Sequence, residues 1–284
     1  MSVVEQLTEP VAYHGEGPVW SSTWGGLKWV DMLAGDILTL LPDGSVERQS
    51  VGTVAAAIRP RAAGGAVVAV ENGFAIDPGA GGLVEYLPGV FDDHGLRMNE
   101  GACDPDGRFY CGSMAWDKET GRGSLYRLDR DRNVTEVMAG VTISNGLDWS
   151  PDGRVAYYVD SATQQIDVFD YDRNHGLRNR RAFVQIPESA GAPDGLTVDA
   201  EGFVWVALWG GSAIHRYKPD GTLDRVVRVP VSQVTALTFG GANLDELFIT
   251  TSREGLVNGA EPSAGALFHY ATHVKGQPVR AYRG

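Results

Sequence analysis

Short apolar runs alternate with turn residues along the whole chain. Three segments share one plan of apolar strand, Asp/Glu/Pro-Gly turn and aromatic or β-branched strand: CDPDGRFYCGSM (103–114), DWSPDGRVAYYVDS (148–161) and TVDAEGFVWVALWG (197–210). No segment shows a convincing apolar period of 3.6 residues over ten positions, whereas short strands bounded by Gly, Pro and Asp turns recur throughout. The pattern therefore predicts an all-β protein.

The same unit occurs in weaker form at 17–32, 57–73 and 237–252, which makes six copies. A third strand follows each copy and a fourth follows most, as in VTEVMAG, RRAFVQI and DRVVRVP. Four short strands repeated at a spacing of roughly 40 to 50 residues are typical of β-propeller blades. We expect a six-bladed β-propeller, with four-stranded blades around a central channel, that forms a single domain over residues 1–284.

An oxygen-bearing side chain, followed by Gly within one or two residues, stands at the start of the inner strand in four units. These positions are Glu16 in HGEGPVW, Asn99-Glu100-Gly101 in RMNEGACDPDG, Asn145-Gly146 in ISNGLDWSPDG and Asp194-Gly195 in APDGLTVDAEG. Because the inner strands of a propeller surround its channel, we expect these side chains to meet although they are distant in sequence. The Gly after each one allows close passage of the backbone.

Carboxylates and carboxamides gathered without a Lys among them repel one another and raise the pKa of a carboxyl group. A divalent cation removes that conflict, and hard oxygen ligands suit Ca²⁺, Mg²⁺ or Mn²⁺. The alternative is that each residue belongs to a turn and bonds its own backbone. Recurrence at four equivalent positions favours the metal.

The formal net charge is −12 at pH 7, and the chain has no run rich in Lys or Arg. We therefore expect neither nucleic acid nor an anionic membrane as a partner. No stretch approaches the roughly 18 apolar residues of a membrane helix, and the N-terminal segment lacks the basic start and apolar stretch of a signal peptide. These features predict a cytoplasmic protein and leave open whether it is a monomer or a small homo-oligomer.

The two cysteines, Cys103 and Cys111, stand on either side of Asp106-Gly107. If that pair is a two-residue turn, Cys103 faces Tyr110 and Cys111 points to the opposite face. Neither a disulfide nor a zinc site is expected from two thiols so placed without a nearby His. We expect two buried free thiols.

The order of the motifs resembles one known family over essentially the whole chain. GEGPVW, R-x-N-x-G-x-x-DPDGR, ISNGLDWSPDGR, PDG-x-x-VDAEG and the tail AGALF…VKGQPVRAY are similar to the senescence marker protein/gluconolactonase/luciferin-regenerating family. The resemblance implies a six-bladed propeller and metal-dependent hydrolysis of a sugar lactone to the aldonic acid. It implies one divalent ion per chain held by Glu16, Asn145 and Asp194, with Ca²⁺ preferred and Zn²⁺, Mg²⁺ or Mn²⁺ as alternatives.

The resemblance also implies which residues contact the substrate. Arg97 and Asn99 match the Arg and Asn of the R-x-N segment, and Asp117 in GSMAWD matches an acidic residue that reaches the sugar. Two positions depart from the family pattern, since Glu100 stands where Asp is common and Asp117 is one methylene shorter than the usual Glu. We expect both to lie where the sugar binds and to affect specificity.

No Ser-His-Asp or Cys-His arrangement is visible, so the expected chemistry rests on the cation. A cation polarises the lactone carbonyl, and Asp194 can both bind the metal and take a proton from the attacking water. Arg97 can bond the hydroxyls of the lactone or the carboxylate of the product. Trp116 and Trp209 either wall the pocket or belong to the core. We interpret His14, two residues before Glu16, as a solvated loop histidine.

Two other functions fit the same fold. One is an arylesterase or phosphotriesterase that uses the cation as a Lewis acid, which a wide apolar entrance would favour. The other is a non-enzymatic propeller that binds calcium or a protein. The polar rim expected from Arg97, Asn99, Glu100 and Asp117 favours sugars, and acids converging on the channel favour an enzyme.

Overall fold

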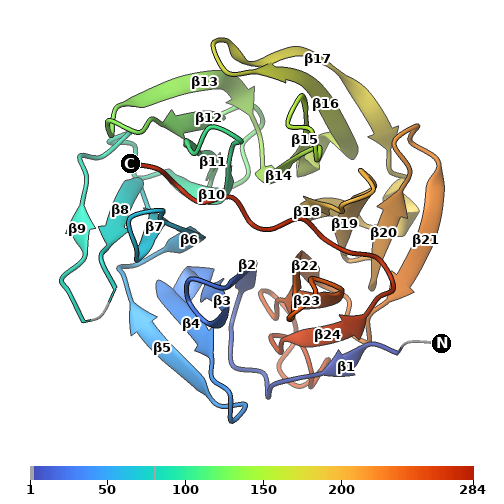
Figure 1. The fold of residues 1–284 in the computed structure, drawn as a ribbon. Helices are drawn as coiled ribbons and strands as arrows, with labels where there is room; N and C mark the ends of the chain where they lie inside the picture. The colour runs from blue at the N-terminus through green and yellow to red at the C-terminus, as the bar shows by residue number, and fades with distance from the viewer. Residues whose placement is uncertain (1–2, 80) are drawn as a thin grey trace.

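The computed structural model describes residues 3–79 and 81–284. Six four-stranded antiparallel sheets stand around one central axis, which confirms the predicted six-bladed propeller (Figure 1). Besides strands, the described residues form only three short 3-10 helices, Met32–Ala34, Ser161–Thr163 and Glu188–Ala190. Within those residues, no helix is both long and apolar enough to span a membrane.

The blades follow one another along the chain, each with its first strand innermost. Blade 1 consists of β2 (Gly15–Ser21), β3 (Gly26–Asp31), β4 (Asp36–Leu40) and β5 (Val46–Ser50). Blade 2 consists of β6 (Ala55–Pro60), β7 (Ala66–Val70), β8 (Gly73–Asp77) and β9 (Glu85–Tyr86). Blade 3 consists of β10 (Leu96–Cys103), β11 (Phe109–Ala115), β12 (Gly123–Leu128) and β13 (Val134–Val141).

The second half of the chain repeats this plan. Blade 4 consists of β14 (Ser144–Trp149), β15 (Val155–Asp160), β16 (Gln165–Asp172) and β17 (Gly176–Gln185). Blade 5 consists of β18 (Ala192–Val198), β19 (Val204–Trp209), β20 (Ala213–Tyr217) and β21 (Leu223–Arg228). Blade 6 consists of β22 (Val234–Gly240), β23 (Glu246–Thr251) and β24 (Phe268–Ala271), with β1 (Glu5–Gln6) as its outermost strand.

The ring is closed by strand β1, which comes from the N-terminal end and pairs with β24. Glu5 lies opposite His269 and Gln6 lies opposite Phe268. The N-terminal strand thereby completes a blade whose other strands come from residues 234–271. This pairing ties blade 6 to blade 1 through the short connection between β1 and β2.

The innermost strand of every blade carries a β-bulge. The register shifts between Glu16 and Val19 in blade 1, Met98 and Gly101 in blade 3, Ser144 and Leu147 in blade 4, and Pro193 and Leu196 in blade 5, with shorter shifts at 55–57 and 234–236. A bulge adds one residue to a strand and re-aims the side chains there. The four predicted positions Glu16, Asn99, Asn145 and Asp194, called the ring residues below, therefore stand where consecutive side chains turn toward opposite ends of the channel.

Two of the Gly residues that follow ring residues are required by close packing of neighbouring inner strands. A Cβ on Gly195 would lie 2.5 Å from Cβ of Ala236, and a Cβ on Gly146 would lie 2.6 Å from the backbone N of Leu196. Real Cβ atoms do not approach other atoms that closely. The expectation that these Gly residues let backbone pass closely is confirmed.

The C-terminal segment 276–284 crosses the central axis and closes one end of the channel (Figure 1). Gln277 Nε2 donates to the carbonyl oxygens of Trp149 (3.0 Å) and Val198 (2.9 Å), which lie in blades 4 and 5. Arg280 pairs with Asp148 at 3.1 Å, and the Tyr282 N–H donates to the carbonyl of Pro60 in blade 2 at 2.8 Å. The segment is thus bonded to blades on both sides of the axis.

Both cysteines are buried and free, as expected. The expected pairing of Cys103 with Tyr110 is wrong, because Cys103 lies opposite Phe109. The loop is longer than a two-residue turn: the Asp104 N–H donates to the Arg108 carbonyl at 2.9 Å, and the Asp104 carboxylate accepts the N–H groups of Asp106 and Arg108. This loop shifts the register by one residue relative to the expectation.

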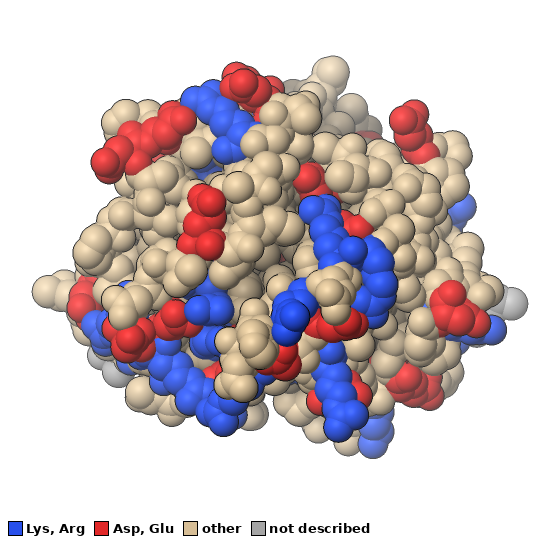
Figure 2. Space-filling view, turned by 90° about the horizontal axis from the view of Figure 1, so that it is seen from above, with Lys and Arg blue, Asp and Glu red and all other residues tan. Residues whose placement is uncertain are grey.

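Charged side chains of both signs share the surface. Figure 2 shows Lys and Arg lying close to Asp and Glu over much of the face that it draws. Ion pairs of the molecule include Arg132 with Glu85 at 2.9 Å and Arg181 with Asp170 at 2.8 Å. The absence of a nucleic-acid partner stays a prediction.

Candidate active site

A cavity of about 240 Å³ opens at the end of the channel away from the C-terminal segment. Its lining includes five of the residues predicted from the sequence, all of them buried: Glu16, Arg97, Asn99, Asn145 and Asp194. They come from β2, β10, β14 and β18, so four blades contribute. The remaining lining residues are His14, Met114, Trp116, Lys118, Ile143, Ser161, Ala192, Trp209 and Glu254.

Two buried carboxylates give the cavity its main electrostatic feature. Burial raises the pKa of Glu16 well above its usual value, and the Glu100 carboxylate adds to that rise. Burial also raises the pKa of Asp194, followed by repulsion from Glu16 and then Glu100. Glu16 accepts one hydrogen bond, from the Gly17 N–H at 3.0 Å. Among the described residues, no Lys or Arg forms an ion pair with Glu16 or Asp194 within 4.0 Å.

Hydrogen-bonded amides connect the arginine of the cavity to the neighbourhood of Asp194. Arg97 Nη1 donates to Asn99 Oδ1, and Asn99 Nδ2 donates to Asn145 Oδ1 at 2.9 Å. Asn145 Nδ2 donates to Ser161 Oγ at 2.7 Å, and that hydroxyl donates to the Pro193 carbonyl at 2.6 Å. The chain of bonds fixes the orientation of both amides, so that Asn145 Oδ1 keeps a second lone pair without a protein donor.

This donor set fits a hard divalent cation. Two carboxylates that repel each other and one amide oxygen are the ligand types that Ca²⁺, Mg²⁺ and Mn²⁺ prefer. In the described part of the chain, no three His, Cys, Asp or Glu side chains form a group that could hold a metal. The predicted ligands include only two side chains of these types, Glu16 and Asp194, and the third ligand is the amide of Asn145. The finding therefore does not exclude the predicted metal site.

His14 lies inside the cavity wall, so its interpretation as a solvated loop histidine is wrong. The side chain is buried, and Nδ1 lies 2.8 Å from Ser252 Oγ. Burial lowers the pKa of His14 to about 3, with further lowering by the positive charges of Arg97 and Lys118. The imidazole is therefore neutral near pH 7, and its Nε2 lies 3.9 Å from Glu16 Oε1.

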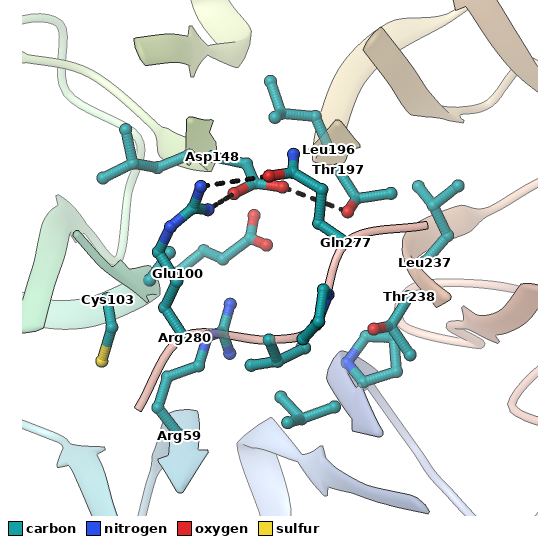
Figure 3. A pocket seen from close by; sticks show the side chains of 17 residues that line it. Arg59, Glu100, Cys103, Asp148, Leu196, Thr197, Leu237, Thr238, Gln277 and Arg280 are labelled. Carbon is teal, nitrogen blue, oxygen red and sulfur yellow. Dashed lines mark hydrogen bonds and ion pairs between the residues drawn. The ribbon is translucent and has the colours of Figure 1, made fainter. Parts of the chain in front are cut away.

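The structure places two predicted substrate contacts outside this cavity. Asp117 is exposed, and its carboxylate accepts the Glu119 N–H at 3.1 Å. Glu100 points the other way along the channel, into a separate chamber of about 50 Å³ (Figure 3). The bulge at 98–101 explains this, because Asn99 and Glu100 are consecutive residues that face opposite ends of the channel.

The chamber around Glu100 is closed by the C-terminal segment. Arg59 reaches into it from β6, and Asp148 and Arg280 form an ion pair in its wall (Figure 3). Glu100 Oε2 is buried without a hydrogen-bond partner among the described residues. Where Glu100 stands, blades 1, 4 and 5 have Gly after Glu16, Asn145 and Asp194, so blade 3 alone of these four carries a side chain at this position.

The sequence reasoning missed two charged lining residues, Lys118 and Glu254. Lys118 follows β11 in a turn in which its N–H donates to the Ala115 carbonyl at 3.0 Å. Glu254 follows β23, and its carboxylate lies 3.4 Å from His14 Nδ1. Both residues follow the second strand of a blade, and neither stands at the start of an inner strand, where the oxygen-bearing positions recur. Trp116 and Trp209, which it left open as wall or core residues, line the cavity.

Comparison with known proteins identifies the family of the chain. The family model for the SMP-30/Gluconolactonase/LRE-like region matches residues 14–253. Regucalcin of Oryctolagus cuniculus is 34% identical over 95% of both chains, and Bacillus subtilis YvrE, provisionally named a sugar lactone lactonase, is 33% identical over 98% of this chain and 97% of its own. A solved structure of Agrobacterium tumefaciens regucalcin, described as a calcium-binding protein, is 29% identical and superposes with a TM-score of 0.94 over 100% of this chain and 98% of its own. The protein therefore belongs to the SMP-30/gluconolactonase/LRE-like family.

Proposed function

We propose that the protein is a metal-dependent lactonase that hydrolyses a sugar lactone to the corresponding acid. The observation that carries the proposal is the pair of buried carboxylates, Glu16 and Asp194, which face a cavity of small-molecule size without a Lys or Arg ion-pair partner. The sugar lactone lactonase name of the Bacillus relative supports the activity, and the calcium-binding description of the Agrobacterium structure supports Ca²⁺ as the first choice of cation.

In this proposal Glu16, Asn145 and Asp194 hold one divalent cation. When bound there, the cation supplies Lewis-acid stabilisation of the negative charge that develops on the lactone carbonyl oxygen. The Asp194 carboxylate takes a proton from the attacking water. Water adds to the carbonyl carbon, the bond between that carbon and the ring oxygen breaks, and the ring oxygen takes a proton. At neutral pH the product is a hydroxy acid anion plus one released proton.

Arg97 and Asn99 orient the substrate on the blade 3 side. Asn99 is fixed by its bonds to Ser144 (2.7 Å) and Asn145 (2.9 Å). The guanidinium of Arg97 lies over the Trp116 ring at 5.1 Å from its centroid. Both N–H groups of Asn99 are used in these bonds, so Asn99 offers its Oδ1 oxygen, and an acceptor that is already fixed loses little conformational entropy when it binds a sugar hydroxyl. The rings of Trp116 and Trp209 offer flat apolar faces to the C–H side of the substrate.

The apolar lining favours a second candidate reaction. Met114, Trp116, Ile143 and Trp209 line one cavity, and an aryl ester or a phosphotriester would also bury apolar surface there. Such a hydrolase would use the same cation and the same base. A propeller that binds calcium without catalysis would hold the ion and turn over none of these compounds.

A substrate panel separates the three candidates. Metal-stripped protein is assayed with sugar lactones, aryl esters and phosphotriesters, first in EDTA and then with Ca²⁺, Mg²⁺, Mn²⁺ or Zn²⁺ restored. We expect lactone hydrolysis that is lost in EDTA and returns with metal, and no return in a Glu16→Ala/Asp194→Ala double variant. Preferred turnover of the aryl ester or phosphotriester would replace the lactonase assignment, and stoichiometric Ca²⁺ binding without any turnover would leave a calcium-binding propeller.

A further inference from the structure

The charges that line the cavity are segregated by blade. The three carboxylates come from blades 1, 5 and 6, where Glu16, Asp194 and Glu254 lie. The two cations, Arg97 and Lys118, both come from blade 3, one on β10 and the other in the turn after β11. A ligand in this cavity therefore meets carboxylates on one side and a positively charged wall on the other.

Arg97 is a buried cation without an anionic partner. It is 5% exposed, and its hydrogen bonds all use Nη1, which donates to Asn99 Oδ1, the Met98 carbonyl and Met32 Sδ. Its Nε is buried and has no acceptor. No carboxylate of the described residues lies within 4.0 Å of the guanidinium. A buried charge is costly unless it is paired, which makes this group a receptor for an anion.

Two other arginines of the same chain show the contrasting arrangement. Arg216 directs Nε and Nη2 at Asp199 Oδ2, at 3.0 and 2.7 Å. Arg180 directs the same two atoms at Asp167 Oδ2, at 2.8 and 2.6 Å. These two arginines each have an acid as partner, whereas Arg97, which faces the cavity, has none within 4.0 Å among the described residues.

Lys118 is the second unpaired cation of this wall. The acids nearest to it in sequence are occupied, since Arg122 pairs with Asp93 at 2.8 Å and with Glu119 at 3.1 Å. Asp117 accepts the backbone N–H of Glu119.

We propose that the substrate is a lactone that carries a second, free carboxylate, and that this carboxylate binds to Arg97 and Lys118 on the blade 3 wall. The reacting carbonyl then lies toward Glu16 and Asp194. The inference rests on the proposed lactonase function and narrows its substrate to lactones of sugar diacids. A neutral sugar lactone would place no anion within hydrogen-bond reach of the buried guanidinium of Arg97.

The test compares two lactones that differ at one carbon. Glucono-lactone has a hydroxymethyl group where glucaro-lactone has a carboxylate. We expect kcat/KM at least about tenfold higher for the acidic lactone, because charge-assisted hydrogen bonds are the stronger kind. Lys118→Met should raise KM for the acidic lactone roughly fivefold to tenfold more than it raises KM for the neutral one. The matched control is Lys218→Met, which removes the same charge from an exposed turn between β20 and β21.

A binding measurement decides the inference independently of turnover. Quenching of tryptophan fluorescence gives dissociation constants for the product diacid, glucarate, and the monoacid, gluconate. Glucarate should bind more tightly than gluconate, and Lys118→Met should weaken the binding of glucarate more than that of gluconate. Equal affinity for both acids, or equal kcat/KM for both lactones, would overturn the inference and leave the lactonase assignment standing. Failure to hydrolyse either lactone with any metal would count against the proposed function, while the binding constants would still decide this inference.

Discussion

Asn99 Nδ2 donates a 2.9 Å hydrogen bond to Asn145 Oδ1 and a 2.7 Å bond to the Ser144 carbonyl, and so joins the inner strands of blades 3 and 4. This relationship couples the two halves of the candidate site. Asn99 belongs to the proposed substrate contacts and Asn145 to the proposed metal ligands. The oxygen offered to the cation is therefore oriented by the residue that orients the substrate.

Replacing Asn99 should separate these two effects. Asn99→Ala removes the acceptor of Arg97 and the donor to Asn145, while Asn145 keeps its 2.7 Å bond to Ser161. We expect kcat/KM to fall by about 10–100-fold, as for roughly 1–3 kcal/mol of lost hydrogen bonding. Metal affinity should change by less than about tenfold. Kinetics at saturating metal and a calorimetric metal titration measure both, and complete loss of metal would place Asn99 among the ligands.

The Gly residues after the ring residues yield a prediction about stability. Gly195→Ala puts a methyl group 2.5 Å from Cβ of Ala236, so strands β18 and β22 must separate. We expect a loss of about 1–3 kcal/mol in the free energy of unfolding, measured by urea denaturation. Gly26→Ala is the control, because nothing lies within 4 Å of the added carbon there. Equal stability of the two variants would mean that the inner strands tolerate wider spacing than the structure has.

Local signals in the sequence were sufficient to predict the fold and most of the cavity. Each blade begins with an apolar strand and a tight turn, and each turn leaves its mark as Asp, Pro or Gly. The ring positions were found because the oxygen-bearing residue recurs next to a Gly, as at Asn145-Gly146 and Asp194-Gly195. Both features are properties of a few adjacent residues.

Features that depend on distant contacts were not predictable in this way. Strand β1 has two exposed residues, so no hydrophobic pattern marks it, and its partner β24 lies at the other end of the chain. The burial of His14 follows from its contact with Ser252, 238 positions away. The direction of Glu100 depends on the bulge at 98–101. The residue that the bulge adds makes the Glu100 side chain face the end of the channel opposite to that of Asn99.

Glu100 should make the stability of the protein depend on pH. Burial raises the pKa of Glu100 to about 7, against the opposing effect of Arg59, and the ordinary value is 4.5. Between these values the folded state binds a proton that the unfolded state has released, so stability falls as pH rises through this window. In metal-free protein, Glu100→Gln should be more stable than wild type at pH 8, by roughly 3 kcal/mol at most, with the difference vanishing near pH 5.

Urea denaturation at several pH values measures this difference, and Asp117→Asn serves as the control because that acid is exposed. A gap between wild type and Glu100→Gln that is the same at pH 5 and pH 8 would contradict the prediction. It would mean that Glu100 is charged in the folded protein at both pH values, with Arg59 as its counter-ion.

Asp194 has two roles in the proposed mechanism, and a pair of variants can separate them. Asp194→Asn keeps an oxygen ligand but cannot accept a proton, whereas Glu16→Gln removes a charge from the metal site but no base. Both variants should bind metal more weakly, because each removes one of the two buried carboxylates. Saturating metal should then restore more activity to Glu16→Gln, since removal of a general base costs about 10²–10⁴-fold in rate.

The comparison requires metal occupancy and the spontaneous reaction to be controlled. Occupancy is confirmed for both variants by elemental analysis, and the rate of uncatalysed lactone hydrolysis is subtracted at each pH. The role of Asp194 as base should also appear in the dependence of kcat on pH. Glu16→Gln should show the same dependence as the wild-type enzyme, whereas Asp194→Asn should lack the fall in kcat at low pH that protonation of the base causes. Equal recovery of the two variants at full occupancy would make Asp194 a ligand only. The proton would then go to another group of the cavity or to solvent, and neutral His14, 3.9 Å from Glu16, would be the next residue to replace.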